Sequence, residues 1–155
     1  MKELNKLIRE GILLTAGNID NFNTMTIGWG FFGTIWRDDV FVCFVRPSRY
    51  TSQFINNNEY FTVSFFFPAY RREISYLGSH SGRDGDKVAH VGFTPIQLEN
   101  GIGFKEAEKT IVCRKLYVQD LDINNIPDDI REIYYAQGDV HQMFIGKIVR
   151  EYENN

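Results

Sequence analysis

Most hydrophobic residues of the chain lie in short runs that are rich in β-branched and aromatic side chains. The runs FFGTIW (31–36), VFVCFV (40–45) and YFTVSFFF (60–67) contain the residue types that pleated sheets accept best. Further strands are predicted for residues 12–17, 24–33, 94–99, 110–121 and 141–153. The pattern therefore predicts a mainly β protein.

The run 40–45 is apolar at every position, whereas a strand with one face in water alternates apolar and polar residues. Both faces of this strand should therefore be covered. A barrel closed by helices, or a sheet packed against a second subunit, meets that requirement, and a sheet with one solvated face does not.

Three segments show helical spacing or helix end signals. Residues 48–58 place Tyr50 and Phe54 on one face and end in three asparagines, which are typical of helix ends. Residues 126–138 have a proline and two aspartates where a first helical turn favours them, and residues 70–79 form the third predicted helix. No repeat, linker or low-complexity segment divides the sequence, so we expect one domain over residues 1–155.

Composition limits the classes of function. The chain has 155 residues, of which 43% are hydrophobic, and a net charge of −3. With this balance and no block of basic residues, we expect no binding to nucleic acid or to an anionic membrane. No signal-peptide core or membrane-spanning run is recognisable, which predicts a cytoplasmic location. There Cys43 and Cys113 would be reduced thiols, and neither belongs to a cluster that holds a metal.

The stretch VRPSRYTSQF (45–54) places two arginines where a predicted strand gives way to a predicted helix. A helix N-terminus offers unpaired N–H groups, and Arg46, Ser48, Arg49 and Thr51 would lie beside it. Because guanidinium groups bind phosphate oxygens in pairs, the stretch is typical of a phosphate site. The alternative is that one arginine pairs with a surface carboxylate and the other packs on the neighbouring tyrosine. Taken alone, the stretch favours neither reading.

The stretch SGRDGDK (81–87) is suited to complete an anion site. Ser81, Arg83 and Lys87 supply hydrogen-bond donors, and Gly82 and a second glycine allow the backbone to approach an anion closely. The alternative is an exposed loop whose second aspartate caps a short helix. Because the stretch matches neither a P-loop nor a GxGxxG motif, it does not indicate a nucleoside triphosphate or Rossmann site.

The stretch NTMTIGWG (23–30) reads as a strand whose two faces differ. Every second residue from Thr24 is small, which gives a narrow face that bears hydroxyl groups, and the residues between them are bulky and apolar. A flat ring can lie on the narrow face and receive backbone hydrogen bonds at its edge. The alternative is an ordinary barrel strand whose small face packs against a helix.

Five stretches in this order and with this spacing resemble the flavoredoxin-type branch of the flavin reductase-like, FMN-binding split-barrel family. They are NTMTIGWG, VRPSRYT, SGRDGDK, CRKLYVQDL and HQMFIGKI, and the resemblance covers residues 11–150. It implies a six-stranded Greek-key split β-barrel with flanking helices. It also implies a homodimer that holds FMN near the subunit boundary, and no metal.

The resemblance implies roles for particular residues. Those expected to hold the FMN phosphate are Arg46, Ser48, Arg49 and Thr51. Those expected to line the isoalloxazine and ribityl groups are Asn23, Thr24, Met25, Thr26, Ile27, Gly28 and Trp29. Those expected to close the site, from the same chain or from the partner subunit, are Ser81, Gly82, Arg83 and Lys87.

His141 is the candidate catalytic residue. Relatives in the wider family often carry a Gly-Asp-His run before the last strand, with the histidine near the nicotinamide, whereas this chain reads GDVH with Val140 inserted. His141 would begin the last strand and lie at the barrel rim. The alternative is a histidine at a strand end that is bonded to a backbone carbonyl.

The resemblance implies an NAD(P)H-dependent flavin oxidoreductase that passes electrons from reduced FMN to free flavin or to a small redox partner. The chemistry would belong largely to the flavin, and the sequence shows no nucleophile or carboxylate pair that would indicate another reaction. Two alternatives remain open. One is a non-enzymatic FMN carrier that a partner protein reduces, and the other is a flavin-free β-barrel interaction domain.

Overall fold

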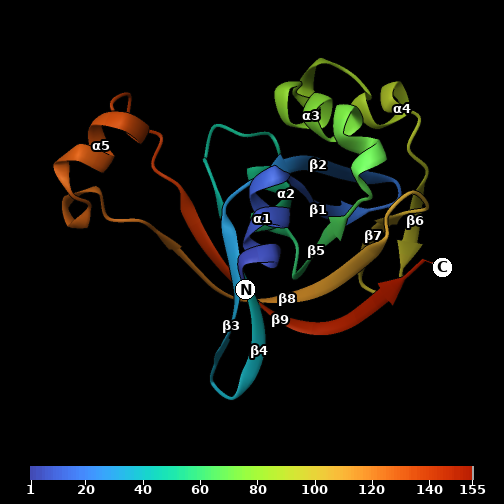
Figure 1. Ribbon diagram of the computed structural model, residues 1–155, viewed down its shortest axis with the longest axis horizontal. Coiled ribbons are helices and arrows are strands. Elements are labelled where there is room, and N and C mark those ends of the chain that lie inside the picture. Colours follow the sequence, from blue (N-terminus) through green and yellow to red (C-terminus); the bar gives the residue numbers. More distant parts are fainter. Residues whose placement is uncertain (155) are drawn as a thin grey trace.

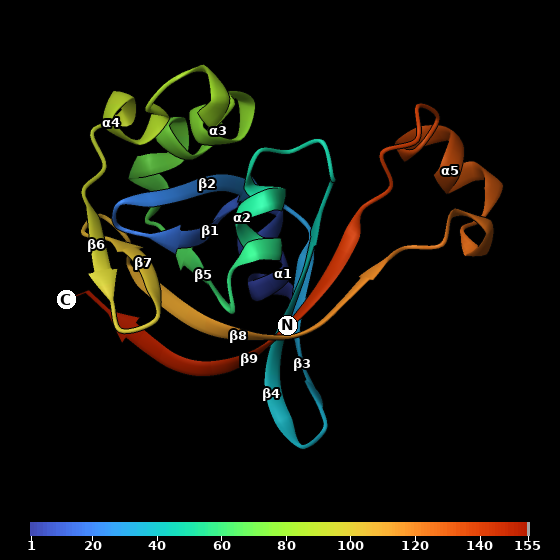
Figure 2. The same ribbon diagram turned by 180° about the vertical axis from the view of Figure 1, so that it is seen from behind.

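The structure, a computed structural model, describes residues 1–154, and the last residue of the expected domain, 155, lies outside them. The described strands form a seven-stranded antiparallel sheet in the order β2-β1-β5-β8-β9-β4-β3 and a separate pair, β6-β7 (Figures 1 and 2). The strands are β1 (Ile12–Asn18), β2 (Asn21–Ile27), β3 (Gly30–Ile35), β4 (Asp38–Val45), β5 (Tyr60–Phe65), β6 (Pro95–Leu98), β7 (Gly101–Phe104), β8 (Lys109–Asp120) and β9 (Gln142–Glu153).

The large sheet is a barrel that is open along one side, because its two edge strands, β2 and β3, are not paired with each other. This confirms the mainly β split-barrel prediction, although the strand number differs from the expected six. Residues 24–33 were expected to form one strand, but the chain turns at Gly28 and Trp29. The turn is required because β2 and β3 lie at opposite edges of the sheet.

Helices pack against the strands of the barrel. The predicted helices are present but shorter than expected, and an additional N-terminal helix was not predicted although Leu4, Leu7 and Ile8 have helical spacing. Ile8 is 2% exposed and anchors that helix on the core. The helices are α1 (Lys2–Glu10), α2 (Thr51–Asn57), α3 (Arg71–Ser79), α4 (Lys87–Val91) and α5 (Asp128–Tyr134), with short 3-10 turns at Pro68–Tyr70, Gly82–Asp84 and Ile123–Asn125.

The α2 helix begins at Thr51 and not at the expected residue 48. The preceding residues form turns instead, in which the Arg49 N–H donates to the Arg46 carbonyl at 3.0 Å and the Ser52 N–H donates to the Arg49 carbonyl at 3.0 Å. Since the first helical N–H groups are partly satisfied in this way, an anion at this place depends on side chains more than on the helix end.

The core confirms that β4 is covered on both faces. Phe41, Cys43 and Val45 are buried inside the barrel, while Val40 and Val42 are buried in a smaller cluster on the other face. A separate cluster beneath α3 and α4 joins these helices to β1 and β7. Both cysteines are free and fully buried, so they act as core residues.

Two parts of the chain project from the barrel. Figures 1 and 2 show the β3-β4 hairpin extending on one side and α5, between β8 and β9, on another. Within residues 1–154, no helix is both long and apolar enough to cross a membrane.

Candidate functional site

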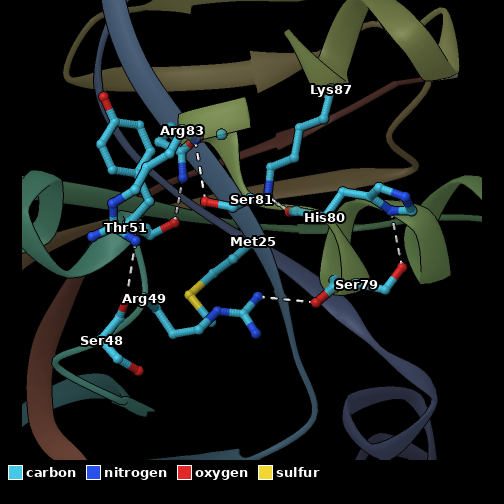
Figure 3. A pocket seen from close by; sticks show the side chains of 13 residues that line it. Met25, Ser48, Arg49, Thr51, Ser79, His80, Ser81, Arg83 and Lys87 are labelled. Carbon is cyan, nitrogen blue, oxygen red and sulfur yellow. Dashed lines mark hydrogen bonds between the residues drawn. The ribbon is translucent and has the colours of Figure 1, made fainter. Parts of the chain in front are cut away.

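A cavity of about 180 Å³ lies between β2, the start of α2, the end of α3 and the loop before α4 (Figure 3). The sequence-predicted residues that line it come from three stretches far apart in the chain. They are Asn23, Met25, Ser48, Arg49, Thr51, Ser81, Gly82, Arg83 and Lys87, and they are joined by Tyr50, Gly78, Ser79 and His80.

The charge of this first cavity is uniformly positive. Arg49, Arg83 and Lys87 line it, and none of its lining residues is an aspartate or glutamate. None of the three cations takes part in an ion pair with the described part of the chain. Because Arg49 is partly buried and Lys87 is buried, and cations without counter-charges are unfavourable there, the arrangement favours an anionic ligand.

Lys87 is 6% exposed, which is unusual for a lysine without a carboxylate partner. Its ammonium donates to the backbone carbonyls of Leu77 at 2.8 Å and His80 at 2.9 Å, which leaves one of three N–H groups for a ligand. Burial, and secondarily the charge of Arg49, lowers the pKa of Lys87 to about 8. An anion in the cavity would raise the pKa of Lys87 again, against the effects of burial and of the Arg49 charge.

Arg49 reaches across the cavity to α3. Its guanidinium donates to the Gly78 carbonyl at 3.0 Å, and burial lowers its pKa from the usual value. The other N–H groups of this side chain bond to no described residue. They remain available to an anion between Arg49 and Lys87.

Close packing shapes the wall of the first cavity at Gly82. A Cβ atom there would come within 2.1 Å of Asn23 Oδ1, so only glycine fits. Asn23 is held in turn by a hydrogen bond from Nδ2 to Thr51 Oγ1 of 2.8 Å. Arg83 closes the same wall, since its guanidinium lies 5.0 Å from the centre of the Tyr50 ring.

A second cavity of about 170 Å³ lies where the barrel is open, at the turn between β2 and β3. It shares Met25 and Arg49 with the first cavity, so the two adjoin. Its lining residues are Met25, Thr26, Ile27, Gly28, Trp29, Phe44, Arg46, Arg49 and His141. One end of the combined site is therefore cationic, and the other combines apolar and aromatic side chains with Arg46 and His141.

His141 forms part of the wall of the second cavity and does not bond to a backbone carbonyl through its ring. Its Nδ1 atom lies 2.7 Å from the Tyr135 hydroxyl oxygen, and its ring centre lies 4.7 Å from that of Trp29. Burial, with a smaller contribution from Arg46, lowers the pKa of His141 to about 4. The imidazole is therefore neutral near pH 7.

The structure separates the two arginines that the sequence placed together. Arg46 lies at the second cavity only, and its guanidinium donates to the carbonyls of Asp139 and Tyr134, each at 2.9 Å. Ser48 is bonded to Asp139 as well, through its N–H at 3.1 Å and through its hydroxyl. Arg46 and Ser48 thus fasten the base of the α5 projection.

The two faces of β2 have different neighbours. Thr24 bonds to Thr15 at 2.8 Å and lines neither cavity, and Thr26 donates to the Ile74 carbonyl of α3 at 2.5 Å. At Thr26 the hydroxyl-bearing face therefore packs against α3, as in the alternative above, while Thr26 and Gly28 of the same face also line the second cavity. Asn23 and Met25, on the opposite face, border the first cavity.

Some lining residues were missed by the sequence analysis. Gly78, Ser79 and His80 directly precede the predicted SGRDGDK stretch, so their position was a usable signal. Tyr135, which lines neither cavity but bonds to His141, was missed as well, because the sequence gave no signal for it.

Comparisons with known proteins agree with the fold. The family model described as the flavin reductase like domain matches residues 6–155, and no curated protein matched. Flavoredoxin from Methanosarcina acetivorans is 22% identical, with a TM-score of 0.74 over 92% of this chain and 67% of that one. An FMN-binding protein from Thermus thermophilus is 21% identical, with a TM-score of 0.73 over 93% and 70% of the two chains. Nitrilotriacetate monooxygenase component B from Bacillus cereus is 16% identical, with a TM-score of 0.73 over 99% and 77%.

Proposed function

Because the chain belongs to the family of flavin reductase-like domains, we propose that it binds FMN across the two adjoining cavities. In this proposal it is an NAD(P)H-dependent flavin oxidoreductase, which passes electrons from reduced FMN to free flavin or to a small redox partner. FMN supplies the hydride and electron chemistry when bound, and the protein supplies binding and orientation.

The observation that carries the proposal is the positive charge of the first cavity. Arg49, Arg83 and Lys87 surround it without a carboxylate among its lining residues. A phosphate monoester has a charge near −2 and several acceptor oxygens, so it matches two guanidinium groups and an ammonium. These three side chains would hold the FMN phosphate, with Thr51 and Ser81 as neighbouring hydroxyl groups.

The second cavity suits the other end of the same ligand. The turn from Ile27 to Trp29 and the side chain of Met25 offer an apolar border beside the phosphate end, at the open side of the barrel. A flavin ring bound there would remain accessible to a second molecule. One similar structure, an FMN-binding protein from Thermus thermophilus, supports this assignment.

A second candidate function is an FMN-binding electron-transfer protein that a partner protein reduces. Two of the similar structures are flavoredoxins, which favours this candidate. The inserted Val140 before His141 favours it too, because it departs from the run that the wider family places near the nicotinamide.

An absorption spectrum and an anaerobic mixing experiment test the proposal. The purified protein, incubated with FMN and then desalted, should retain a flavin absorption band. Anaerobic NADH or NADPH should then bleach that band quickly. A bound flavin that neither nucleotide reduces would favour the electron-transfer protein, and the absence of any bound flavin would contradict both candidates.

We further propose that the chain forms a homodimer and acts in the cytoplasm. Large apolar side chains are exposed on both projections, among them Trp36 on the β3-β4 hairpin and Ile133 on α5. A symmetric partner would cover such surfaces. The two buried, free thiols are compatible with a reducing compartment.

A further inference from the structure

Two buried side chains at the second cavity, Tyr135 and His141, are bonded to each other. They are 7% and 8% exposed, and the Tyr135 hydroxyl oxygen lies 2.7 Å from His141 Nδ1. His141 lines the cavity, whereas Tyr135 does not. Tyr135 therefore acts on the cavity through the histidine.

The direction of this hydrogen bond follows from the acceptors that are available. If the imidazole donated, the phenol hydrogen would need another acceptor, and residues 1–154 provide none for the Tyr135 hydroxyl. Donation from the phenol to Nδ1 satisfies the phenol hydrogen within the chain. A neutral imidazole that accepts at Nδ1 carries its hydrogen on Nε2.

The Nε2 atom is free to meet a ligand. It bonds to none of the described residues. Among these residues Glu73 Oε2 is the one side-chain polar atom that is both fully buried and without a partner, so the unpartnered Nε2 is not fully buried. Nε2 therefore retains exposed surface, and His141 borders the second cavity. The ring is held in place by Trp29, whose centre lies 4.7 Å away.

Burial, assisted by one charged neighbour, keeps the imidazole neutral. Burial and the adjacent Arg46 lower the pKa of His141 to about 4, against a smaller opposite effect of Asp139. The Arg46 guanidinium also lies over the Tyr135 ring, 5.1 Å from its centre. A neutral N–H donor suits an uncharged acceptor oxygen, since neither partner then buries an unpaired charge.

We propose that Tyr135 is a positioning residue, whose hydroxyl fixes His141 as the neutral Nε2–H tautomer so that the second cavity presents an N–H donor to a carbonyl-type oxygen. The carboxamide of a nicotinamide is an oxygen of this class. The identity of the ligand rests on the proposed function, whereas the tautomer is a property of the chain alone.

The first experiment reads the tautomer directly. Nitrogen-15 NMR of the imidazole rings in the full-length protein should show an unprotonated Nδ1 and a protonated Nε2 for His141 near pH 7. In Tyr135→Phe the two nitrogen signals should move toward an average of both tautomers. The pKa of His141 should rise by roughly half to one pH unit, because the lost hydrogen bond stabilised only the neutral ring.

Tyr134→Phe is the matched control. Tyr134 is the adjacent tyrosine, it lies outside the second cavity, and its hydroxyl bonds to no described residue. In the Tyr134→Phe variant, the imidazole nitrogen signals and the pKa of His141 should equal those of the parent. A protonated Nδ1 in the parent, or identical spectra for the parent and Tyr135→Phe, would overturn the inference.

The second experiment measures function in the FMN-loaded protein. Tyr135→Phe should slow anaerobic reduction by NAD(P)H roughly threefold to tenfold while FMN affinity is unchanged. In a His141→Gln background, where the side chain carries its own N–H, Tyr135→Phe should add no further loss. An additional loss there would show that Tyr135 acts independently of His141. If neither nucleotide reduces the parent protein, the proposed function fails while the NMR result still decides the tautomer.

Discussion

At the scale of single residues, the two arginines of the VRPSRYTSQF stretch have different tasks. Arg49 reaches into the first cavity and is anchored on the Gly78 carbonyl, whereas Arg46 is bonded to two carbonyls at the base of α5. The difference matters because Arg49 lines the first cavity, the proposed phosphate site, and Arg46 does not. Each arginine is therefore the natural control for the other.

Arg49→Ala should weaken FMN binding and leave riboflavin binding nearly unchanged. The lost charge-assisted hydrogen bond is worth about 1.5–3 kcal/mol, which corresponds to roughly tenfold to a hundredfold in affinity. Arg46→Ala should leave the ratio of the FMN and riboflavin dissociation constants near that of the parent. Fluorescence titration with both flavins measures these ratios, and an equal change of the ratio in both variants would contradict the assignment.

Lys87 should make FMN affinity depend on pH. The pKa of this ammonium is lowered to about 8, so it is mostly charged in the free protein below pH 8 and mostly neutral above. A bound phosphate favours the charged form, and binding above pH 8 therefore requires uptake of a proton. Affinity should be constant from pH 7 to 8 and then fall, by at most about tenfold per pH unit.

Lys87→Met tests this origin of the pH dependence. The variant should bind FMN more weakly at pH 7, and its affinity should no longer fall between pH 8 and 10. Riboflavin titrated over the same range shows whether the flavin or the protein itself contributes. A slope that persists in Lys87→Met would assign the titration to another group.

At the scale of elements, the site depends on how closely α3 lies against β2. A Cβ atom at Gly78 would come within 2.9 Å of Thr26 Cβ, so the helix and the strand touch at this glycine. The same glycine supplies the carbonyl that holds Arg49. The contact of Gly78 with Thr26 thus positions both β2 and the Arg49 side chain of the proposed phosphate site.

Gly78→Ala should lower stability and FMN affinity together. Overpacking of this kind destabilises by about 1–3 kcal/mol, or roughly 2–12 °C in melting temperature for a domain of this size. Gly33→Ala is the control, because a Cβ atom there meets no described atom within 4 Å. Thermal unfolding with and without FMN measures both effects, and a Gly78→Ala protein as stable as Gly33→Ala would show that α3 can shift at little cost.

At the scale of the whole molecule, the β3-β4 hairpin presents an unusual tip. Trp36 is 59% exposed and has a φ of 53°, a left-handed conformation that a bulky residue rarely adopts. Asparagine adopts this conformation more readily than tryptophan and has a polar side chain. An exposed tryptophan in a strained position is explained if the tip is covered by a second copy of the chain.

Trp36→Asn should therefore weaken dimerisation without unfolding the protein. Arg37→Asn is the control, since Arg37 has a φ of 63° at the same turn but adds little apolar surface. Light scattering after size-exclusion chromatography over micromolar concentrations measures the association. A parent protein that is monomeric and still binds FMN tightly would refute a dimer-dependent site.

The sequence by itself determined the secondary structure class and the stretches that carry the cationic residues, and its resemblance to a known family implied the split barrel. Strand composition and the apolar run 40–45 depend on local patterns, which the structure keeps because local preference and burial agree there. The sequence did not determine that one predicted strand is divided at residues 28–29. This turn exists because β2 and β3 join opposite edges of the sheet.

Only the tertiary structure decided which of these residues meet. Arg49 bonds to a residue 29 positions away, Arg46 bonds to one 93 positions away, and the hydroxyl of Tyr135 reaches His141 across the base of the α5 projection. Which neighbour Thr26 meets depended likewise on where α3 packs. A pattern along the chain fixes which side chains share a face, but the neighbour of that face comes from distant segments, and the chain must fold before the two are in contact.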